Sequence, residues 1–133
     1  MKASLILPTA LTLFITTTIT TSSALGINCR GSLFCAFGSV GSLSELQQKA
    51  NNLHDDALFA EGQHIVCHYD DGSNPGLCAF TQNTNGQPIN GRRTKELLAG
   101  LAAHGCNRCG SNPFQNNDVS QGQLTVNYVA VKG

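Results

Sequence analysis

The side chains best suited to chemistry in this sequence are six cysteines, arranged as two distant clusters and a central pair. Cys29 and Cys35 lie near the start of the chain, and Cys106 and Cys109 lie near its end, shortly after His104. Thiols at these spacings can form structural disulfides, a redox-active C-x-x-C pair, or a zinc site that includes His104 and Cys29. A redox C-x-x-C motif belongs at a helix N-terminus, whereas this one follows a predicted helix end. We therefore expect disulfides, with no metal and no other cofactor.

The central pair, Cys67 and Cys78, flanks a run of turn-forming residues. Adjacent strands of a hairpin can bring two such Cα atoms within bridging range, so local geometry predicts a Cys67–Cys78 disulfide. This bond closes a loop of about 12 residues, for which the entropy model gives about 2.8 kcal/mol. The other four cysteines allow more than one pairing from the sequence alone.

Two histidines offer a second kind of chemistry. With Glu61 and Arg92 or Arg93, His64 and His68 could imitate the acid, base and anion-binding groups of a small secreted ribonuclease. We expect both on one strand face, where residues four apart lie about 13 Å from each other, too far to share one phosphate. Surface histidines are the better interpretation. Because the sequence contains no nucleophile triad, phosphate loop or paired-carboxylate motif, we predict that the protein is not an enzyme.

Basic residues are the remaining candidates for a binding function. Arg92, Arg93 and Lys95 lie together at the start of a predicted helix and could contact a channel or another acidic surface. The alternative is a solvated helix face, since positive charge at a helix N-terminus is mildly unfavourable. Arg30 and Arg108 adjoin cysteines, which favours a structural hydrogen-bonding role beside the disulfides.

The first 24 residues have the features of a signal peptide. Lys2 is followed by a largely apolar stretch that Pro8 and several threonines interrupt, and Ser22 and Ala24 fit the small-residue rule for cleavage. We expect residues 1–24 to be removed and residues 25–133 to form one secreted, extracellular domain. Loss of Lys2 leaves one more acidic than basic residue, which indicates neither nucleic-acid binding nor membrane insertion. We expect a monomer.

Apolar periodicity predicts two helices. Ser42-Leu43-Ser44-Glu45 has the form of a capping box, and the apolar spacing after it predicts a helix over residues 43–59 that ends near Gly62. A second helix is predicted over residues 92–104, with Gly105 as the C′ residue.

Alternation and turn residues predict the strands. They are expected at residues 26–29, 64–69, 77–81 and 122–131, with loops at 31–41 and 83–91. This arrangement indicates an α+β protein, a small disulfide-stapled α/β sandwich in which two helices pack on one face of an antiparallel sheet.

Two blocks of the sequence resemble a known family. The run Leu25-Gly26-Ile27-Asn28-Cys29-Arg30-Gly31-Ser32 with Cys35, and the C-terminal block from His104 to Val129, are similar to the killer protein four family. This family includes a smut-fungus virus killer toxin and related proteins that fungi encode in their own genomes.

The resemblance implies a pairing and a function. It implies the disulfides Cys29–Cys106 and Cys35–Cys109. For the loop that the first of these closes, the same entropy model gives a stabilisation of about 4.5 kcal/mol. It also implies growth inhibition of competing fungal cells, with plant cells as a further target. The implied mechanism is block of calcium uptake through voltage-gated calcium channels, without enzymatic activity or pore formation. The implied partner is a cell-surface protein, a calcium channel of the target cell.

Two departures from the family bear on this function. The founding toxin is basic, whereas this chain is close to neutral. A lysine important for channel block precedes the cysteine of its middle strand, and an alignment anchored on Val66 and Cys67 puts Ile65 at that place. An isoleucine cannot supply positive charge to a cation pathway. A secreted effector or surface-binding module that has lost channel block is therefore the alternative function.

Overall fold

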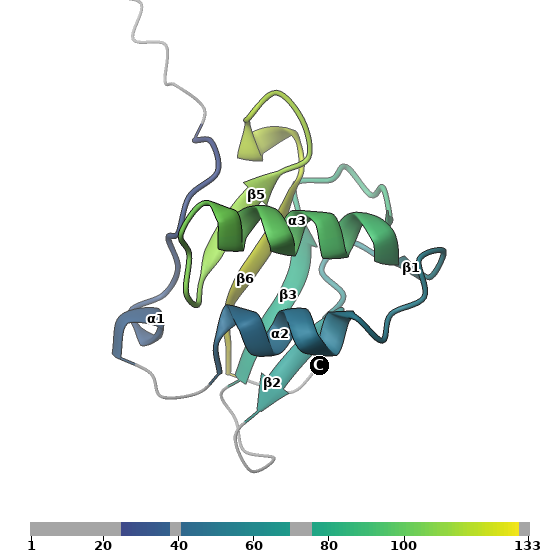
Figure 1. Cartoon of the computed structure of the whole chain (residues 1–133). Helices are drawn as coiled ribbons and strands as arrows, with labels where there is room; N and C mark the ends of the chain where they lie inside the picture. Colours follow the sequence, from purple (N-terminus) through teal and green to yellow (C-terminus); the bar gives the residue numbers. More distant parts are fainter. Residues whose placement is uncertain (1–24, 38–40, 70–75, 131–133) are drawn as a thin grey trace, which may run out of the picture.

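The computed structural model describes residues 25–37, 41–69 and 76–130 as an antiparallel sheet with two helices on one face (Figure 1). The predicted leader, residues 38–40 of the predicted loop, the predicted turn at residues 70–75 and the last three residues lie outside the described residues. The main sheet has the strand order β2-β3-β6-β5. Its strands are β2 (Val66–Tyr69), β3 (Gly76–Gln82), β5 (Gly110–Pro113) and β6 (Gln123–Val129).

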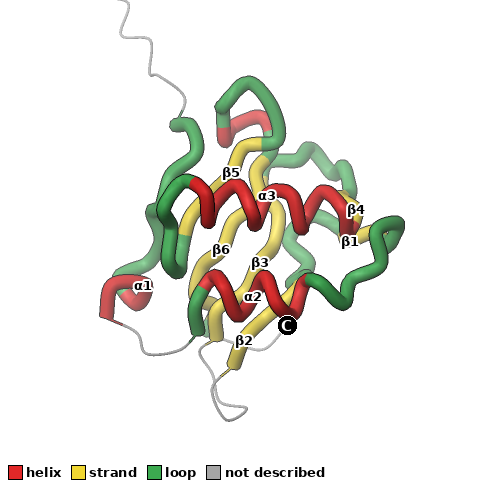
Figure 2. The backbone as a smooth tube through the Cα atoms, viewed as in Figure 1, coloured by secondary structure: helices red, strands yellow, loops and turns green. Residues whose placement is uncertain are grey.

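The two main helices are α2 (Leu43–Ala50) and α3 (Gly91–Ala103), which lie in front of the sheet in Figure 2. Their apolar faces and the facing strands form one core. The fully buried side chains include Leu46 of α2, Leu98 and Leu101 of α3, and Leu77 and Leu124 of the strands. This arrangement confirms the predicted fold class.

The capping box predicted for α2 is present. Ser42 is the N-cap, its Oγ accepts a hydrogen bond from the Glu45 amide at 3.3 Å, and the Ser42 amide donates to Glu45 Oε2 at 3.2 Å. Helix α3 agrees with the prediction to within a residue at each end, and Gly105 follows it with a φ of 97°, a conformation that favours glycine.

The predicted end of the first helix is wrong. Helix α2 ends at Ala50 instead of residue 59, and the Leu53 amide turns back to the Ala50 carbonyl. Asn51 and Asn52 follow Ala50, and asparagine side chains compete with the helix for backbone hydrogen bonds. The next residues instead form β1 (Leu58–Phe59), which pairs with β4 (Ile89–Asn90) in a separate two-stranded sheet.

Three further differences concern short elements. The predicted loop at residues 31–41 contains helix α1 (Phe34–Phe37), and the predicted strand at residues 26–29 is a single bridge from Asn28 to Ser111. Strand β5 and the 3-10 helix η2 (Val119–Gln121) were not predicted. Strand β5, the Asn28 bridge and the Val119 amide of η2 bond to distant residues, which local patterns do not encode.

We predict that Ser42→Ala lowers the free energy of unfolding by about 1 kcal/mol, because it removes the oxygen that accepts from the Glu45 amide. Urea denaturation with the disulfides intact measures this change. Gln48→Ala, at an exposed position of the same helix, is the matched control and should change stability by less than about 0.5 kcal/mol. Equal effects of the two substitutions would contradict a capping role for Ser42.

Candidate functional site

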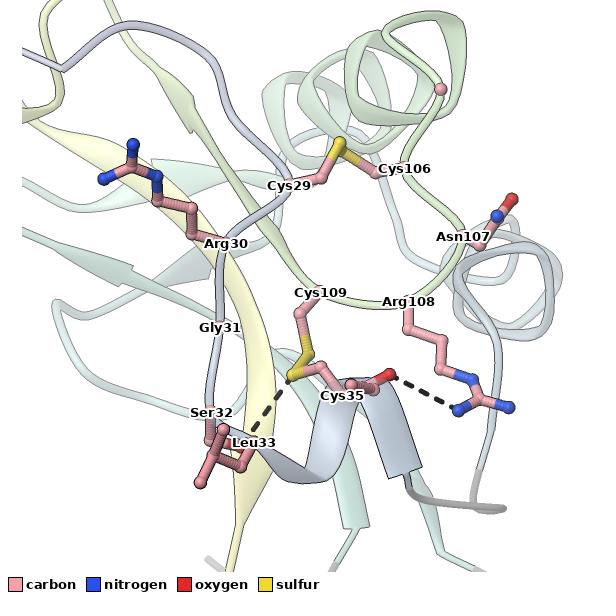
Figure 3. A pocket seen from close by; sticks show the side chains of 12 residues that line it. Cys29, Arg30, Gly31, Ser32, Leu33, Cys35, Cys106, Asn107, Arg108 and Cys109 are labelled. Carbon is pink, nitrogen blue, oxygen red and sulfur yellow. Dashed lines mark hydrogen bonds between the residues drawn. A yellow bond between two sulfur atoms is a disulfide. The ribbon is translucent and has the colours of Figure 1, made fainter.

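Three disulfides cross-link the chain: Cys29–Cys106, Cys35–Cys109 and Cys67–Cys78. The last joins directly opposed residues of β2 and β3, with Cα atoms 4.1 Å apart. The other two tie the N-terminal segment to the turn between α3 and β5 (Figure 3). The cysteines of the C-x-x-C motif are thus bonded to two different partners, which leaves no thiol in that motif for redox exchange or zinc.

A groove lies between the segments that these two disulfides join. We call it the cysteine groove; its volume is about 770 Å³, and it is lined by residues 29–33, 35–36 and 105–109. None of the lining residues is acidic. The groove is therefore a candidate surface for contact with another molecule.

Gly31 allows the two walls of the groove to approach. A Cβ atom at this position would lie 2.5 Å from Cys109 Cβ and 2.6 Å from Cys35 Sγ. Only glycine lets the backbone pass this close to the Cys35–Cys109 bond. The N-terminal segment is held further by the Ser32 amide, which donates to Asn127 Oδ1 at 3.0 Å.

Two arginines flank the groove. Arg108 Nη1 donates to the Cys35 carbonyl at 3.3 Å, which agrees with the structural role expected for it. The exposed Arg30 extends from the other wall, and the two side chains point away from each other in Figure 3. Among the described residues, no carboxylate lies within 4.0 Å of either guanidinium.

The same region of the chain also carries exposed apolar side chains. Leu33, in the wall of the groove, is 79% exposed, and the neighbouring Phe34 of α1 is 60% exposed. The Phe34 ring lies 6.0 Å from that of Tyr128. Exposed aromatic and aliphatic groups beside arginine are the composition typical of the centre of a protein–protein interface.

The basic residues singled out from the sequence have acidic partners. Lys95 Nζ lies 3.1 Å from Asp55 Oδ1, Arg92 Nε lies 3.9 Å from Asp55 Oδ2, and Arg93 Nη1 lies 3.2 Å from Glu96 Oε2. The hydrogen bond and charge of Lys95 hold the pKa of Asp55 below its usual value. Arg92 has the most exposed side chain of this set, with an exposed fraction of 70%.

Ile65 is a core residue in this structure. Its side chain is 9% exposed and belongs to the same cluster as Leu43 and Leu98. Its amide donates to the carbonyl of Ala79, the residue that Val66 faces in the register. Ile65, which directly precedes β2, and Val66, its first residue, therefore both lie opposite Ala79, and two residues opposite one is the arrangement of a β-bulge.

The bulge separates the two histidines, so their predicted common face is wrong. His64 lies against the Phe80 ring, with centroids 5.9 Å apart, whereas His68 lies 3.3 Å from Glu45 of α2. Glu61 Oε1 accepts from the amide of Thr84 instead of joining either histidine. The ribonuclease-like set is thus not brought together.

Sequence reasoning missed the cysteine groove as a surface. The cysteines that bond its two walls together are 77 and 74 residues apart in the sequence, so no local pattern connects the walls. The local sequence signal for a surface here is the pair Leu33 and Phe34. These apolar residues lie in a Gly/Ser-rich stretch that no predicted helix or strand would carry into the core.

The fold and the groove define a class of protein: a small α+β protein, cross-linked by three disulfides, with an arginine-flanked and partly apolar surface. None of the described helices has the length and apolar character required to cross a bilayer.

Comparison with known proteins specifies this class further. The model of the Kp4 family matches residues 12–130. The KP4 killer toxin of Ustilago maydis P4 virus is 39% identical over 108 residues, which cover 80% of this chain and 81% of that toxin. The chain belongs to the Kp4 family, and it is a killer-toxin-like protein, not an enzyme.

We predict that Lys95→Met raises the pKa of Asp55 towards 3.8, its ordinary value, because the hydrogen bond and the nearest positive charge are both lost. Carboxyl chemical shifts followed by NMR during an acid titration measure this pKa. A depressed pKa stabilises the fold above pH 3.8 and loses that contribution as the pH falls through the folded-state value. Lys95→Met should therefore reduce this loss.

Asp118 serves as the internal control for that titration. Hydrogen bonds from Ser120 lower its pKa independently of Lys95, so its titration should not change in the variant. An unchanged Asp55 titration would mean that the Lys95 pair does not persist in solution.

Proposed function

We propose that this protein is a secreted toxin that inhibits the growth of competing fungal cells, with plant cells as a further target, by blocking calcium uptake through voltage-gated calcium channels. The observation that carries the proposal is the 39% identity to a killer toxin over four-fifths of both chains. Three disulfides support secretion, because such bonds form and persist in oxidising compartments. Residues 1–24 are proposed as the signal peptide and residues 25–133 as the active domain.

The proposed mode of action is binding, without a cofactor, nucleic acid or membrane insertion. A folded monomer binds a channel at the cell surface and holds positive charge at the cation pathway, where it opposes entry of calcium. The cysteine groove supports this mode because Arg30 and Arg108 lack carboxylate partners among the described residues. Arg92, Arg93 and Lys95 are the second proposed contact, although each has an acidic neighbour.

One observation favours a second function. Ile65, aligned with the lysine important for channel block in the founding toxin, is a core residue and offers a partner neither charge nor surface. A protein that kept the fold but lost channel block would act as a secreted effector or surface-binding module. This alternative predicts binding to cells without an effect on calcium.

We expect the protein, secreted from a host that expresses the full chain, to inhibit fungal growth and to reduce uptake of radiolabelled calcium. Excess external calcium should relieve both effects, because the proposed target is the calcium pathway. Growth curves and tracer uptake in several fungal species, together with plant root-hair growth, are the measurements.

The control is the same protein with its disulfides reduced and its thiols alkylated, which should be inactive. Absence of inhibition by the folded protein at micromolar concentration would contradict channel block and favour the effector function. Inhibition that calcium does not relieve would indicate a different receptor.

A pair of matched double variants distinguishes the two proposed contact surfaces. Arg30→Gln with Arg108→Gln removes the charges at the cysteine groove, and Arg92→Gln with Lys95→Gln removes the same number of charges on α3. We expect the groove variant to raise the half-inhibitory concentration about tenfold or more, which corresponds to about 1.4 kcal/mol of binding. The helix variant should change it less than about threefold, because its charges are already paired. The reverse order would assign the contact to α3.

A further inference from the structure

A second cluster of reactive side chains lies on β2, β3 and the residues that lead into β2. One ring nitrogen of His64 and the sulfurs of Cys67 and Cys78 lie within 4.8 Å of one another. Imidazole and thiolate are the ligands that zinc prefers, but both sulfurs are here joined in a disulfide. The cluster therefore contains the ligand types of a zinc site, but the Cys67–Cys78 disulfide prevents the two sulfurs from binding a metal ion.

The β-bulge at Ile65 and Val66 assembles this cluster. Val66 faces Ala79, whose side chain is in the core, so the adjacent pair Cys67 and Cys78 points to the opposite side of the sheet. The extra residue of the bulge turns His64 to that same side, as its contact with Phe80 shows. Without the bulge, His64 would face the helices together with His68.

His64 also has an unused ligand atom. Its Nδ1 is buried and has no hydrogen-bond partner among the described residues; the same is true of His68 Nδ1, but only His64 lies beside the sulfurs. Buried polar atoms nearly always have a partner, so an orphaned nitrogen in the ring that lies beside two sulfurs requires an explanation. A site for a cation that the imidazole nitrogens can ligate supplies one.

The two cysteines of this disulfide differ in their exposure to an external thiol. Cys67 is partly exposed, whereas Cys78 is fully buried. The hydroxyl of Tyr69 lies 3.4 Å from Cys78 Sγ and can donate to it. An external thiolate that attacks Cys67 Sγ displaces Cys78 Sγ as a thiolate, to which the Tyr69 hydroxyl can donate a hydrogen bond.

We propose that opening of the Cys67–Cys78 disulfide converts this cluster into a three-ligand zinc site made by His64, Cys67 and Cys78. Two molecules of a thiol reductant supply two electrons and two protons, become one disulfide, and leave two protein thiols. A divalent zinc ion then displaces one proton from each thiol and binds the two thiolates and the imidazole. The fourth tetrahedral position stays open, as in zinc sites with three protein ligands.

The experiment uses the secreted protein, a titration with a monothiol reductant, and Co²⁺ as a spectroscopic probe for zinc. Alkylation followed by peptide mapping identifies which cysteines open first, and we expect Cys67 and Cys78. At that stage Co²⁺ should give the thiolate charge-transfer and visible bands of a tetrahedral site, and Zn²⁺ should displace it with one metal per chain. The fully oxidised protein should give neither signal.

A matched pair of histidine variants tests the ligand set. His64→Ala should weaken Co²⁺ binding about 100-fold or more, since loss of a ligand exceeds the effect of losing a group that only orients one. His68→Ala, four residues along and paired with Glu45, should leave binding unchanged. His64→Gln provides a second ligand-deficient variant that keeps a polar side chain, and backbone NMR spectra verify that all three remain folded.

Three results would overturn the proposal. They are opening of Cys29–Cys106 or Cys35–Cys109 before Cys67–Cys78, absence of a tetrahedral cobalt spectrum once Cys67 and Cys78 are reduced, and equal metal binding by the His64 and His68 variants. None of these readouts depends on growth inhibition, so the proposal and the toxin function fail or succeed separately.

Discussion

The two disulfides that join the N-terminal segment to the turn after α3 are the constraint on which the outer part of this structure depends. Its other attachments are scattered: the bridge from Asn28 to Ser111, single hydrogen bonds that involve Leu25, Ile27, Ser32 and Cys35, and the ring contact of Phe34 with Tyr128. Helix α1, with four residues, is too short to be stable alone. The covalent bonds therefore supply the order that packing cannot, and the cysteine groove exists because they hold its two walls together.

Charge is distributed unevenly in a chain whose formal net charge is zero. The cations on α3 lie beside Asp55 and Glu96, and their fields largely cancel at the surface. The arginines beside the disulfides have no such neighbours among residues 25–37, 41–69 and 76–130. The net charge of the chain therefore does not predict the electrostatic potential at a binding surface, because a partner responds to the local field over an interface-sized patch.

Elements whose signals are local were predictable. The capping box fixed the start of α2, and the leucine spacing with Gly105 bounded α3. Turn residues between two cysteines indicated the β2–β3 hairpin and its disulfide. The end of α2 was missed because Leu53 continues the apolar spacing of the helix yet packs on the core from a turn. Strands β1, β4 and β5 are short and gain their backbone partners from distant segments, so propensity alone could not reveal them.

The sequence by itself determined the fold class, the Cys67–Cys78 bond and, through its resemblance to a known family, the other two pairings, because spacing, turn chemistry and motif identity are written in local order. Only the tertiary structure decided how the candidate sites are composed. It placed Arg30 and Arg108 on the two walls of one groove, gave Lys95 the partner Asp55, and buried Ile65. It also put His64 and His68 on opposite faces, since one extra residue at the start of β2 inverts the alternation of side chains. Such neighbours meet only when the whole chain has folded.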